Sequence, residues 1–540
     1  MSTTMRSTTM RPILDVATEL GLDLEHLTTL GPHKAKLDPP GSPEARGRLV
    51  LVSALTPTKS GEGKTTVSVG LAMGLRRVGA RTALALREPS LGPVFGVKGG
   101  GTGGDRAQVV PADDVNLHFT GDLHAVGAAH NLLAAMVDTD LYFKAPSGLA
   151  RDRVTWPRVV DMNDRALRRV IVDAGGRAER AARFDITAAS EVMAMLALAG
   201  SLDDLRTRLA RTVVGWSDDG TAITADDLGA TEAMLVLLRE ALRPNLVQTT
   251  EGGPALVHAG PFANIAHGCS SVLATRTGLH HADVVVTEAG FGFDLGGEKF
   301  LHLKAPQADV WPDAVVLVAT VKALRAHGGG DLAAGLPHLE RQLANVRAFG
   351  LAPVVAINVF ADDDPADVAR IRAAADAAGV SAAAVTAFVD GGAGGEDLAR
   401  AVLETLEAAP TTHVPHALYP SDAPFTGKLE AIADTLYGAG GVVFTESAQR
   451  DLDALVAAGY GHLPPCVAKT PLSLTDDPKG GVFAEGHTLT ISEVRLAAGA
   501  GFLVALAGNV FTMPGLPRDP AARHVRLEPD GRVLGLMQGD

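Results

Sequence analysis

Cysteine is nearly absent from this chain, which has only Cys269 and Cys466 among its 540 residues. Two cysteines are too few for a disulfide framework or for a metal site built from cysteine. Such sparing use of thiols is typical of proteins that work in a reducing compartment. We therefore expect a cytoplasmic protein whose fold does not depend on disulfides.

The chain also lacks an unbroken apolar run of membrane length and an excess of basic residues. Stretches with few charges, such as 497–517, are interrupted by glycine and proline, so we expect no membrane span. Acidic residues outnumber basic ones by 62 to 48, which gives a formal net charge of −14. Because a nucleic acid would be repelled by most of such a surface, we expect no nucleic-acid partner, whereas a small anionic ligand remains compatible.

Aromatic residues make up only 4% of the chain, so the position of each one is informative. Phe360 and Phe388 each follow a strand-like run and precede polar or glycine-rich residues. A ring at the end of a strand can stack on a flat ligand, and it can equally be part of the core. The residues alone leave both alternatives open.

What the chain has in abundance is an alternation of strand-like apolar runs with helical patterns. This alternation predicts a mostly parallel sheet covered by helices. In open sheets of this kind, ligands bind beyond the carboxyl ends of the strands, and polar residues follow each predicted strand. The clearest predicted strands are 82–86, 284–286, 314–319, 353–357 and 442–444.

The length of the chain exceeds what one hydrophobic core usually holds, so we expect more than one domain. Glycines at 328–330 and clustered prolines between 410 and 424 interrupt the periodic pattern and are plausible joints. The predicted fold is α/β, with a large phosphate-loop domain at 1–330, a second α/β domain at 331–420 and a C-terminal α/β domain at 421–540.

The stretch 49–74 combines an apolar run, a glycine-containing loop and an amphipathic segment. In such a phosphate loop, backbone N–H groups and the positive end of the helix surround phosphate oxygens, while a lysine and a hydroxyl serve phosphate and magnesium. The strict motif has glycine where this chain has Thr58, and a chance turn is the competing interpretation. The predicted nucleotide-binding residues are Thr58, Lys59, Ser60, Gly61, Glu62, Gly63, Lys64, Thr65 and Thr66, with Thr65 and Thr66 as magnesium ligands.

Arg87 and Glu88 follow the predicted strand 82–86 and precede a glycine-rich segment at 92–104. A guanidinium at the end of a strand can hold a carboxylate or a phosphoryl group through paired hydrogen bonds. An ion pair between Arg87 and Glu88, or another neighbour, is an equally good interpretation from spacing alone. The glycines favour a loop that closes over a ligand, with an ordinary surface loop as the alternative.

Taken together, these motifs resemble the formate–tetrahydrofolate ligase family, also called formyltetrahydrofolate synthetase. The resemblance runs from about residue 11 to about residue 522, and several of the matching strings are long and unusual. They lie at 56–58, 61–66, 86–96, 116–122, 160–165, 184–187, 260–269, 287–292, 468–470, 493–496 and 512–517.

The resemblance implies an ATP-dependent ligase that forms 10-formyltetrahydrofolate from formate and tetrahydrofolate through formyl phosphate, with release of ADP and phosphate. It implies catalytic roles for Lys64, Arg87 and Glu88, a nucleotide contact at Phe291, and folate contacts at Phe360 and Phe388. It also implies Mg²⁺, a monovalent cation (K⁺ or NH₄⁺), a folate that can be polyglutamylated, and a homotetramer.

Two departures from the family pattern keep alternatives open. Phe388 stands where the family usually has tryptophan, and Lys59-Ser60 stands where the family usually has Pro-Ala. A lysine five places before Lys64 also occurs in deviant Walker ATPases, so one alternative is a nucleotide-driven dimer switch. The other is a carboxylate-activating ligase with a different acceptor.

Overall fold

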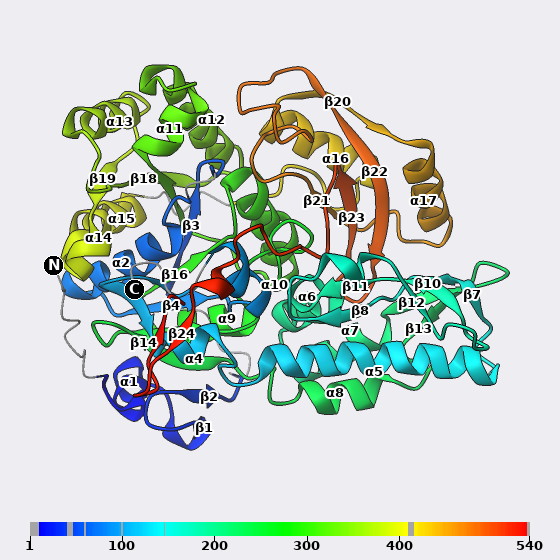
Figure 1. Ribbon diagram of the computed structural model, residues 1–540. Coiled ribbons are helices and arrows are strands. Elements are labelled where there is room, and N and C mark those ends of the chain that lie inside the picture. Colours follow the sequence, from blue (N-terminus) through cyan, green and yellow to red (C-terminus); the bar gives the residue numbers. More distant parts are fainter. Residues whose placement is uncertain are drawn as a thin grey trace.

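The centre of the molecule is a twelve-stranded sheet in which seven neighbouring strands are parallel (Figure 1). The computed structural model describes residues 10–39, 47–58, 61–98, 101–144, 146–408 and 415–536. The main path of the sheet runs through β1 (Leu27–Thr29), β2 (Ala35–Leu37), β14 (Asn245–Thr249), β15 (Pro254–Val257), β4 (Thr82–Leu86), β16 (Val284–Glu288), β3 (Arg48–Ala54), β17 (Ala314–Ala319), β18 (Ala352–Asn358) and β19 (Ala382–Val385), with β6 (Ala107–Val110) and β5 (Gly103–Gly104) attached to β14.

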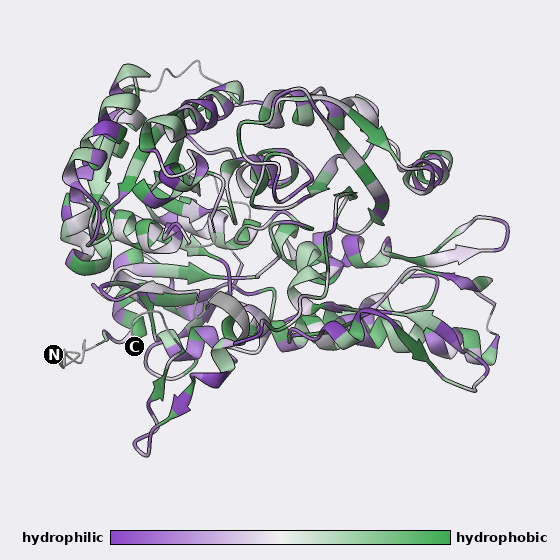
Figure 2. Cartoon of the chain, turned by 45° about the horizontal axis from the view of Figure 1, so that its top comes forward, coloured by the Kyte–Doolittle hydropathy of each residue, from purple (hydrophilic) through white to green (hydrophobic). Residues whose placement is uncertain are grey.

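The central strands are apolar throughout because both of their faces are covered. In β3, Leu49 and Leu51 belong to one hydrophobic cluster, and the alternating residues Val50 and Val52 belong to another. Burial on two faces explains why these strands read as continuous apolar runs. Figure 2 shows apolar colour along the strands of the sheet, whereas the outer helices carry polar and apolar colours together.

Helices pack on both faces of the sheet. On one face, apolar side chains of the strands pack with those of three helices, α2 (Lys64–Arg77), α14 (Ala387–Asp390) and α15 (Glu396–Ala408). The other face carries α9 (Val272–His281), α10 (Ala305–Ala308), α11 (Val321–His327), α12 (Leu332–Ala348) and α13 (Pro365–Ala377).

A lobe built from the residues between β6 and β14 projects from one side of the sheet (Figure 1). Its core is a separate hydrophobic cluster that also receives side chains from the C-terminal strands. The elements that supply this core include α5 (Asp122–Phe143), β7 (Leu149–Val154), α6 (Glu191–Leu198), α7 (Leu202–Ala210), β12 (Val213–Ser217), β13 (Ala222–Thr224) and α8 (Thr231–Leu238).

The C-terminal part of the chain forms a second, four-stranded sheet in the order β20-β22-β23-β21. It packs against the face of the large sheet that carries α12, within one continuous hydrophobic cluster. Its elements are α16 (Phe425–Ile432), β20 (Ala439–Phe444), α17 (Glu446–Ala457), β21 (Pro465–Ala468), β22 (His487–Ala497) and β23 (Phe502–Ala507).

The expectation of a mixed α/β fold with a large, mostly parallel sheet is confirmed. The predicted strand 442–444 is part of β20 in the smaller sheet. The polar residues that follow it therefore do not lie at the edge of the large sheet. The domain boundaries at 330 and 420 stay predictions, and the large sheet itself continues past the first of them through β18 and β19. No helix in the described ranges is both long and apolar enough to cross a membrane.

Both cysteines are buried and unpaired with each other. Burial raises the pKa of Cys269 to about 11 and that of Cys466 to about 12, which keeps both thiols protonated near neutral pH. Because the thiolate is the reactive form, neither residue has the character of a catalytic cysteine.

Glu191, the first residue of α6, connects the projecting lobe to the C-terminal sheet. Its Oε1 accepts hydrogen bonds from the backbone N–H groups of Gly499 (2.7 Å) and Ala500 (3.3 Å), in the turn between β22 and β23. Burial raises the pKa of this carboxyl from 4.5 to about 7, although both hydrogen bonds favour the charged form.

Replacing Glu191 with glutamine should therefore change how stability depends on pH. A raised folded-state pKa contributes stability that is fully present below pH 4.5 and is lost as the pH rises through about 7. The unfolding free energy of Glu191→Gln should increase relative to the wild type across this window, measured by urea unfolding at a series of pH values. Glu446→Gln, at an exposed carboxylate, is the control. A difference that does not vary with pH would contradict the prediction.

Candidate functional site

The predicted site residues gather at the carboxyl ends of adjacent parallel strands. Along the sheet the order is β4, β16, β3, β17, β18 and β19, and each strand runs in the same direction as its neighbour. The segments that follow these strands therefore emerge at one edge, where ligands of open α/β sheets bind. The last residues of β16 and β18 are Glu288 and Asn358, and the segments that follow the strands contain Arg87, the predicted phosphate loop, Thr320 and Phe388.

The predicted phosphate loop connects β3 to α2, as the sequence pattern indicates. Gly63 caps the helix in the left-handed conformation with φ of 68°, and a Cβ atom there would lie 2.4 Å from Asn358 Nδ2. Both the backbone angle and the lack of space require glycine. Lys59 and Ser60, two predicted nucleotide contacts, lie outside the described residues.

The carboxylate of Glu62 links two parts of the site, Thr58 in the loop and Thr320 after β17. One carboxylate oxygen accepts hydrogen bonds from the N–H (2.9 Å) and the hydroxyl (3.0 Å) of Thr58, and the other accepts one from Thr320 Oγ1 (2.8 Å). The carboxylate is therefore satisfied by the protein on both oxygens. Its side chain shapes the loop and ties it to the end of β17.

Lys64 and Thr65, at the start of α2, contact the segment that follows β16. Lys64 Nζ donates a hydrogen bond of 2.8 Å to the carbonyl of Phe291, a residue with the unusual φ of 59°. Thr65 Oγ1 donates to Glu288 Oε1 (3.3 Å), and Ser68 Oγ lies 3.4 Å from the other oxygen of the same carboxylate. A hydroxyl beside a carboxylate offers the oxygen ligands that Mg²⁺ prefers.

Glu288 is a candidate functional residue that the sequence did not single out as a site residue. Its signals were its position just after a predicted strand, which it shares with many acids, and its place in the family-like string 287–292. The side chain is nearly inaccessible, with 6% exposure, and its carboxylate faces the first turn of α2. Only the pairing of β16 with β3 brings it there.

Phe388 and Thr66 face the hairpin of β5 and β6. A Cβ atom on Gly104 would lie 2.7 Å from the Phe388 ring and 3.8 Å from Thr66 Oγ1. The N–H of Arg106 donates to the carbonyl of Phe388 (3.1 Å), and the ring keeps 40% of its surface exposed. Thr65 and Thr66, predicted together as metal ligands, thus have different surroundings.

Phe360 lies beyond the end of β18, the strand next to β19. Its N–H donates to Asp363 Oδ2 (2.8 Å), which fixes the turn, and Lys322 Nζ lies 4.5 Å from the ring centroid. The ring is partly buried rather than a full member of the core. Phe360 and Phe388 therefore follow the neighbouring strands β18 and β19, and both keep exposed surface on which a flat ligand could stack.

Arg87 is held by the segment that follows β15. Its Nη1 donates to the carbonyl of Pro261 (3.0 Å), and a Cβ on Gly290 would lie 3.0 Å from its Nη2. The Nε atom is buried and has no protein partner among the described residues. Arg87 and Lys64 thus approach the consecutive residues 290 and 291, which brings two cations to one short segment.

Glu88 does not pair with Arg87 within the described structure. Its side chain is buried, and its carboxyl is surrounded by other acids. Burial raises the pKa of Glu88 well above its ordinary value, and the negative charges of Asp122 and Asp161 raise it further, against the opposing charge of Lys36. Burial and the neighbouring acids therefore favour the protonated form of Glu88.

Asp161 fixes the start of the glycine-rich segment. Its two oxygens accept hydrogen bonds from Ser90 Oγ (2.5 Å) and from the N–H of Leu91 (3.0 Å). The next turn packs on Asn163, because a Cβ at Gly92 would lie 2.5 Å from Asn163 Oδ1. Glycine at 92 is thus required by close packing within the protein.

Comparison with known proteins gives one consistent result. The family model described as formate–tetrahydrofolate ligase matches residues 2–537. The chain is 55% identical to the formate–tetrahydrofolate ligase of Myxococcus xanthus, with 98% of this chain and 100% of that protein covered. Ligases of the same name from Acidiphilium cryptum and Roseiflexus sp. are 52% and 50% identical, with at least 98% of both chains covered in each case.

Replacing Gly290 with alanine should disturb the segment that Arg87 and Lys64 share. The new Cβ would lie 2.4 Å from Ala263 Cβ, so the backbone has to move. Overpacking of this kind should lower the unfolding free energy by about 1–3 kcal/mol, measured by denaturant unfolding. The matched control is Gly427→Ala, where the nearest atom would lie at an ordinary 3.7 Å. Equal stability of both variants would contradict this account of Gly290.

Proposed function

The chain belongs to the formate–tetrahydrofolate ligase family, and from this premise we propose that it joins formate to tetrahydrofolate at the edge of the large sheet, at the expense of ATP. The resemblance drawn from the motifs is thus confirmed over the whole chain. The observation that carries the proposed site is the approach of Lys64 and Arg87 to residues 290 and 291. One cation belongs to the phosphate loop and the other is suited to a carboxylate.

The proposed reaction has two steps. The formate oxygen first attacks the γ-phosphorus of ATP, which forms formyl phosphate and releases ADP. The N10 amine of tetrahydrofolate then attacks the formyl carbon, and phosphate leaves with the bonding electrons while the amine loses a proton. Activation is needed because formate has no good leaving group, and the mixed anhydride has to be shielded from water.

In this proposal the protein acts mainly by positioning and by neutralising charge. Lys64 and the backbone of the loop hold the phosphates of ATP. Arg87 holds formate and then the charge of the phosphoryl group, for which its fork of donors is suited, with Nε unpartnered among the described residues. Glu88 is the buried residue that follows Arg87, and it supports Arg87 from the interior of the protein.

Magnesium fits the oxygen atoms near Thr65. We assign Thr65 as the better of the two predicted ligands, because its hydroxyl lies beside the Glu288 carboxylate whereas Thr66 faces Gly104. Thr65, beside Glu288, would help to hold Mg²⁺, which would supply positive charge to neutralise the phosphates of ATP. K⁺ or NH₄⁺ dependence stays a prediction from the family resemblance, to which we assign no residue.

The aromatic residues divide between the ligands. Phe291 carries the carbonyl that Lys64 contacts, which suits a nucleotide contact. Phe360 and Phe388, at the ends of β18 and β19, suit the flat ring of the folate, polyglutamylated or not. Phe388 offers less stacking surface than the tryptophan usual in the family.

The two alternatives lose support. A nucleotide-driven dimer switch would account for the phosphate loop alone, whereas the family match spans residues 2–537. Its diagnostic residue, Lys59, lies outside the described part of the chain. A ligase with another acceptor would leave the named relatives unexplained.

We further propose a homotetramer whose contacts involve the projecting lobe. Large apolar side chains are exposed there, including Phe143 at the end of α5 (73%), Val236 on α8 (73%) and Ile171 (59%). Exposed apolar side chains gathered on one lobe favour contact with another chain. A cytoplasmic location is proposed as well, supported by the two buried thiols.

Replacing Arg87 with alanine tests the proposed site most directly. Formate-dependent turnover should fall by at least about 100-fold, because a charge contact in the transition state is lost, while MgATP affinity stays within about 2-fold. Coupled ADP assays and equilibrium nucleotide binding measure the two quantities. Arg153→Ala, which removes an arginine that donates to the carbonyl of Ser217 (2.6 Å) in the projecting lobe, is the control. Turnover of Arg87→Ala equal to that of the control would contradict the role.

Substitutions at Phe388 test the folate contact. Phe388→Leu should raise KM for tetrahydrofolate by about 2- to 10-fold through lost stacking, and Phe388→Trp should lower it. KM for formate should remain unchanged in both variants. Steady-state kinetics with each substrate varied in turn provide the measurement. Identical changes in KM for formate and folate would show that Phe388 acts through the general structure of the site.

A further inference from the structure

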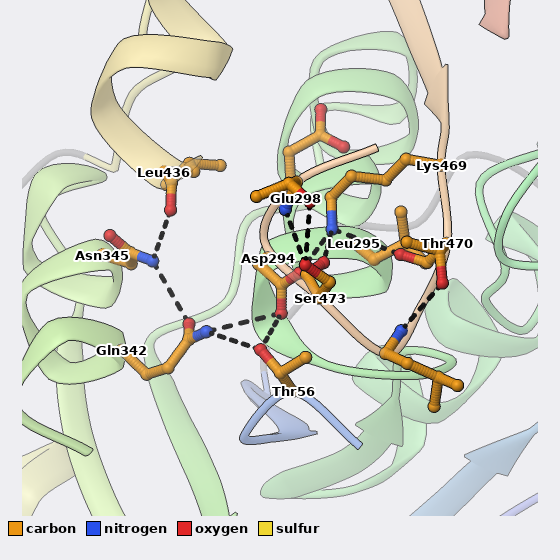
Figure 3. A network of polar contacts seen from close by, with 12 residues as sticks. Thr56, Asp294, Leu295, Glu298, Gln342, Asn345, Leu436, Lys469, Thr470 and Ser473 are labelled. Atoms are coloured by element: carbon orange, nitrogen blue, oxygen red, sulfur yellow. Dashed lines mark hydrogen bonds and ion pairs between the residues drawn. The ribbon is translucent and has the colours of Figure 1, made fainter. Parts of the chain in front are cut away.

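The phosphate loop begins at Thr56, and protein groups hold every polar atom of this buried residue. Figure 3 shows the contacts of its hydroxyl. Its N–H donates to His338 Nε2 (3.3 Å), and its carbonyl accepts a hydrogen bond from His327 Nε2 (2.7 Å). Burial lowers the pKa of His338 to about 3, so its ring is neutral and can accept. Thr56 is therefore fixed by the helices α11 and α12.

The third contact of Thr56 leads to a buried charge. Its hydroxyl donates to Asp294 Oδ1 (3.0 Å), and Gln342 Nε2 lies within hydrogen-bond distance of both atoms. Asp294 has no exposed surface, and burial by itself would raise its pKa. The charge and hydrogen bond of Lys469 outweigh burial, so the pKa of Asp294 is lowered and the residue is a carboxylate.

Lys469 comes from the C-terminal sheet, directly after β21. Its side chain is fully buried, and Nζ lies 3.0 Å from Asp294 Oδ2 (Figure 3). The same ammonium donates to the carbonyls of Ser473 (2.6 Å) and Thr470 (3.4 Å). These contacts satisfy the three donors of the ammonium and fix its position.

Asp294 also lies close to the segment that Lys64 contacts. Asp294 lies three residues after Phe291, whose carbonyl accepts the hydrogen bond of Lys64. A Cβ at Gly292, between them, would lie 2.6 Å from Asp294 Oδ1 and 3.1 Å from both the carbonyl oxygen of Leu55 and Thr56 Cα. The turn at residues 291–294 is thus packed tightly against the start of the phosphate loop, so a shift of Asp294 would displace both.

We propose that Lys469 is a positioning residue through which the C-terminal domain sets the geometry of the phosphate loop, acting by way of Asp294 on Thr56 and on the carbonyl that holds Lys64. The inference rests on the proposed assignment of this loop to ATP. Removing one partner of a buried pair leaves the other charge uncompensated, which is costly and is relieved only by movement or protonation. In this protein the displaced group would be Asp294, and the loop would move with it.

The test compares Lys469→Met with Lys428→Met. Lys428 is a second buried lysine of the C-terminal domain, and its ammonium donates to the carbonyl of His462 (2.5 Å) without contact to the phosphate loop. Both substitutions should lower thermal stability. Only Lys469→Met should raise KM for MgATP, by about 10-fold, while KM for formate stays within about 2-fold.

A double variant separates the charge effect from lost packing. In Lys469→Met/Asp294→Asn no uncompensated charge remains, and an asparagine oxygen can still accept the hydrogen bond of Thr56. KM for MgATP should return to within about 3-fold of the wild type. Failure of this rescue, or equal values of KM for MgATP in Lys469→Met and Lys428→Met, would overturn the proposal.

Lys64→Ala, measured in parallel, distinguishes this failure from failure of the site assignment. If Lys64→Ala weakens MgATP binding while Lys469→Met does not, the loop binds ATP without help from Lys469 and the inference is wrong. If Lys64→Ala leaves MgATP binding unchanged, the loop is not the ATP site, and both the site assignment and the inference fall.

Discussion

The burial of the central parallel strands on both faces is the constraint from which the rest of the structure follows. Because β3, β16, β17 and β18 carry apolar side chains on either side, polar groups occur chiefly where these strands end. Parallel pairing places all of those ends at one edge. The sheet thus brings the loop, the cations and the carboxylates together at its edge, although its own interior is apolar.

The charges of Glu62 and Asp294 at this edge are satisfied by protein groups. Glu62 is satisfied by Thr58 and Thr320, and Asp294 by Thr56 and Lys469. An unpaired charge in such surroundings would carry a large desolvation cost. These contacts hold Thr56, Thr58 and Glu62 in place within the described part of the loop, which suits catalysis by positioning. Arg87 differs, because its Nε has no protein partner among the described residues.

Local pattern in the sequence was enough to predict the strand, loop and helix at 49–74 and to propose Arg87 for the candidate site. Strand, loop and helix at 49–74 follow from an apolar run, glycines and periodicity, and Arg87 was found because it follows a strand. Glu288 and Lys469 could not be assigned in this way, because their partners Thr65 and Asp294 are 223 and 175 residues away along the chain. Only the strand order and the docking of the second sheet bring them together. The same holds for Glu62, whose carboxylate holds the loop instead of facing a ligand.

The central claim is that one site couples ATP cleavage to the joining of formate and tetrahydrofolate. The most direct measurement is ADP release by the purified protein with MgATP and K⁺, with formate and tetrahydrofolate added separately and together. The account predicts sustained ADP release only when both are present, together with the absorbance of methenyltetrahydrofolate after acid treatment. ADP release that is independent of both substrates would contradict it and would favour a switch ATPase.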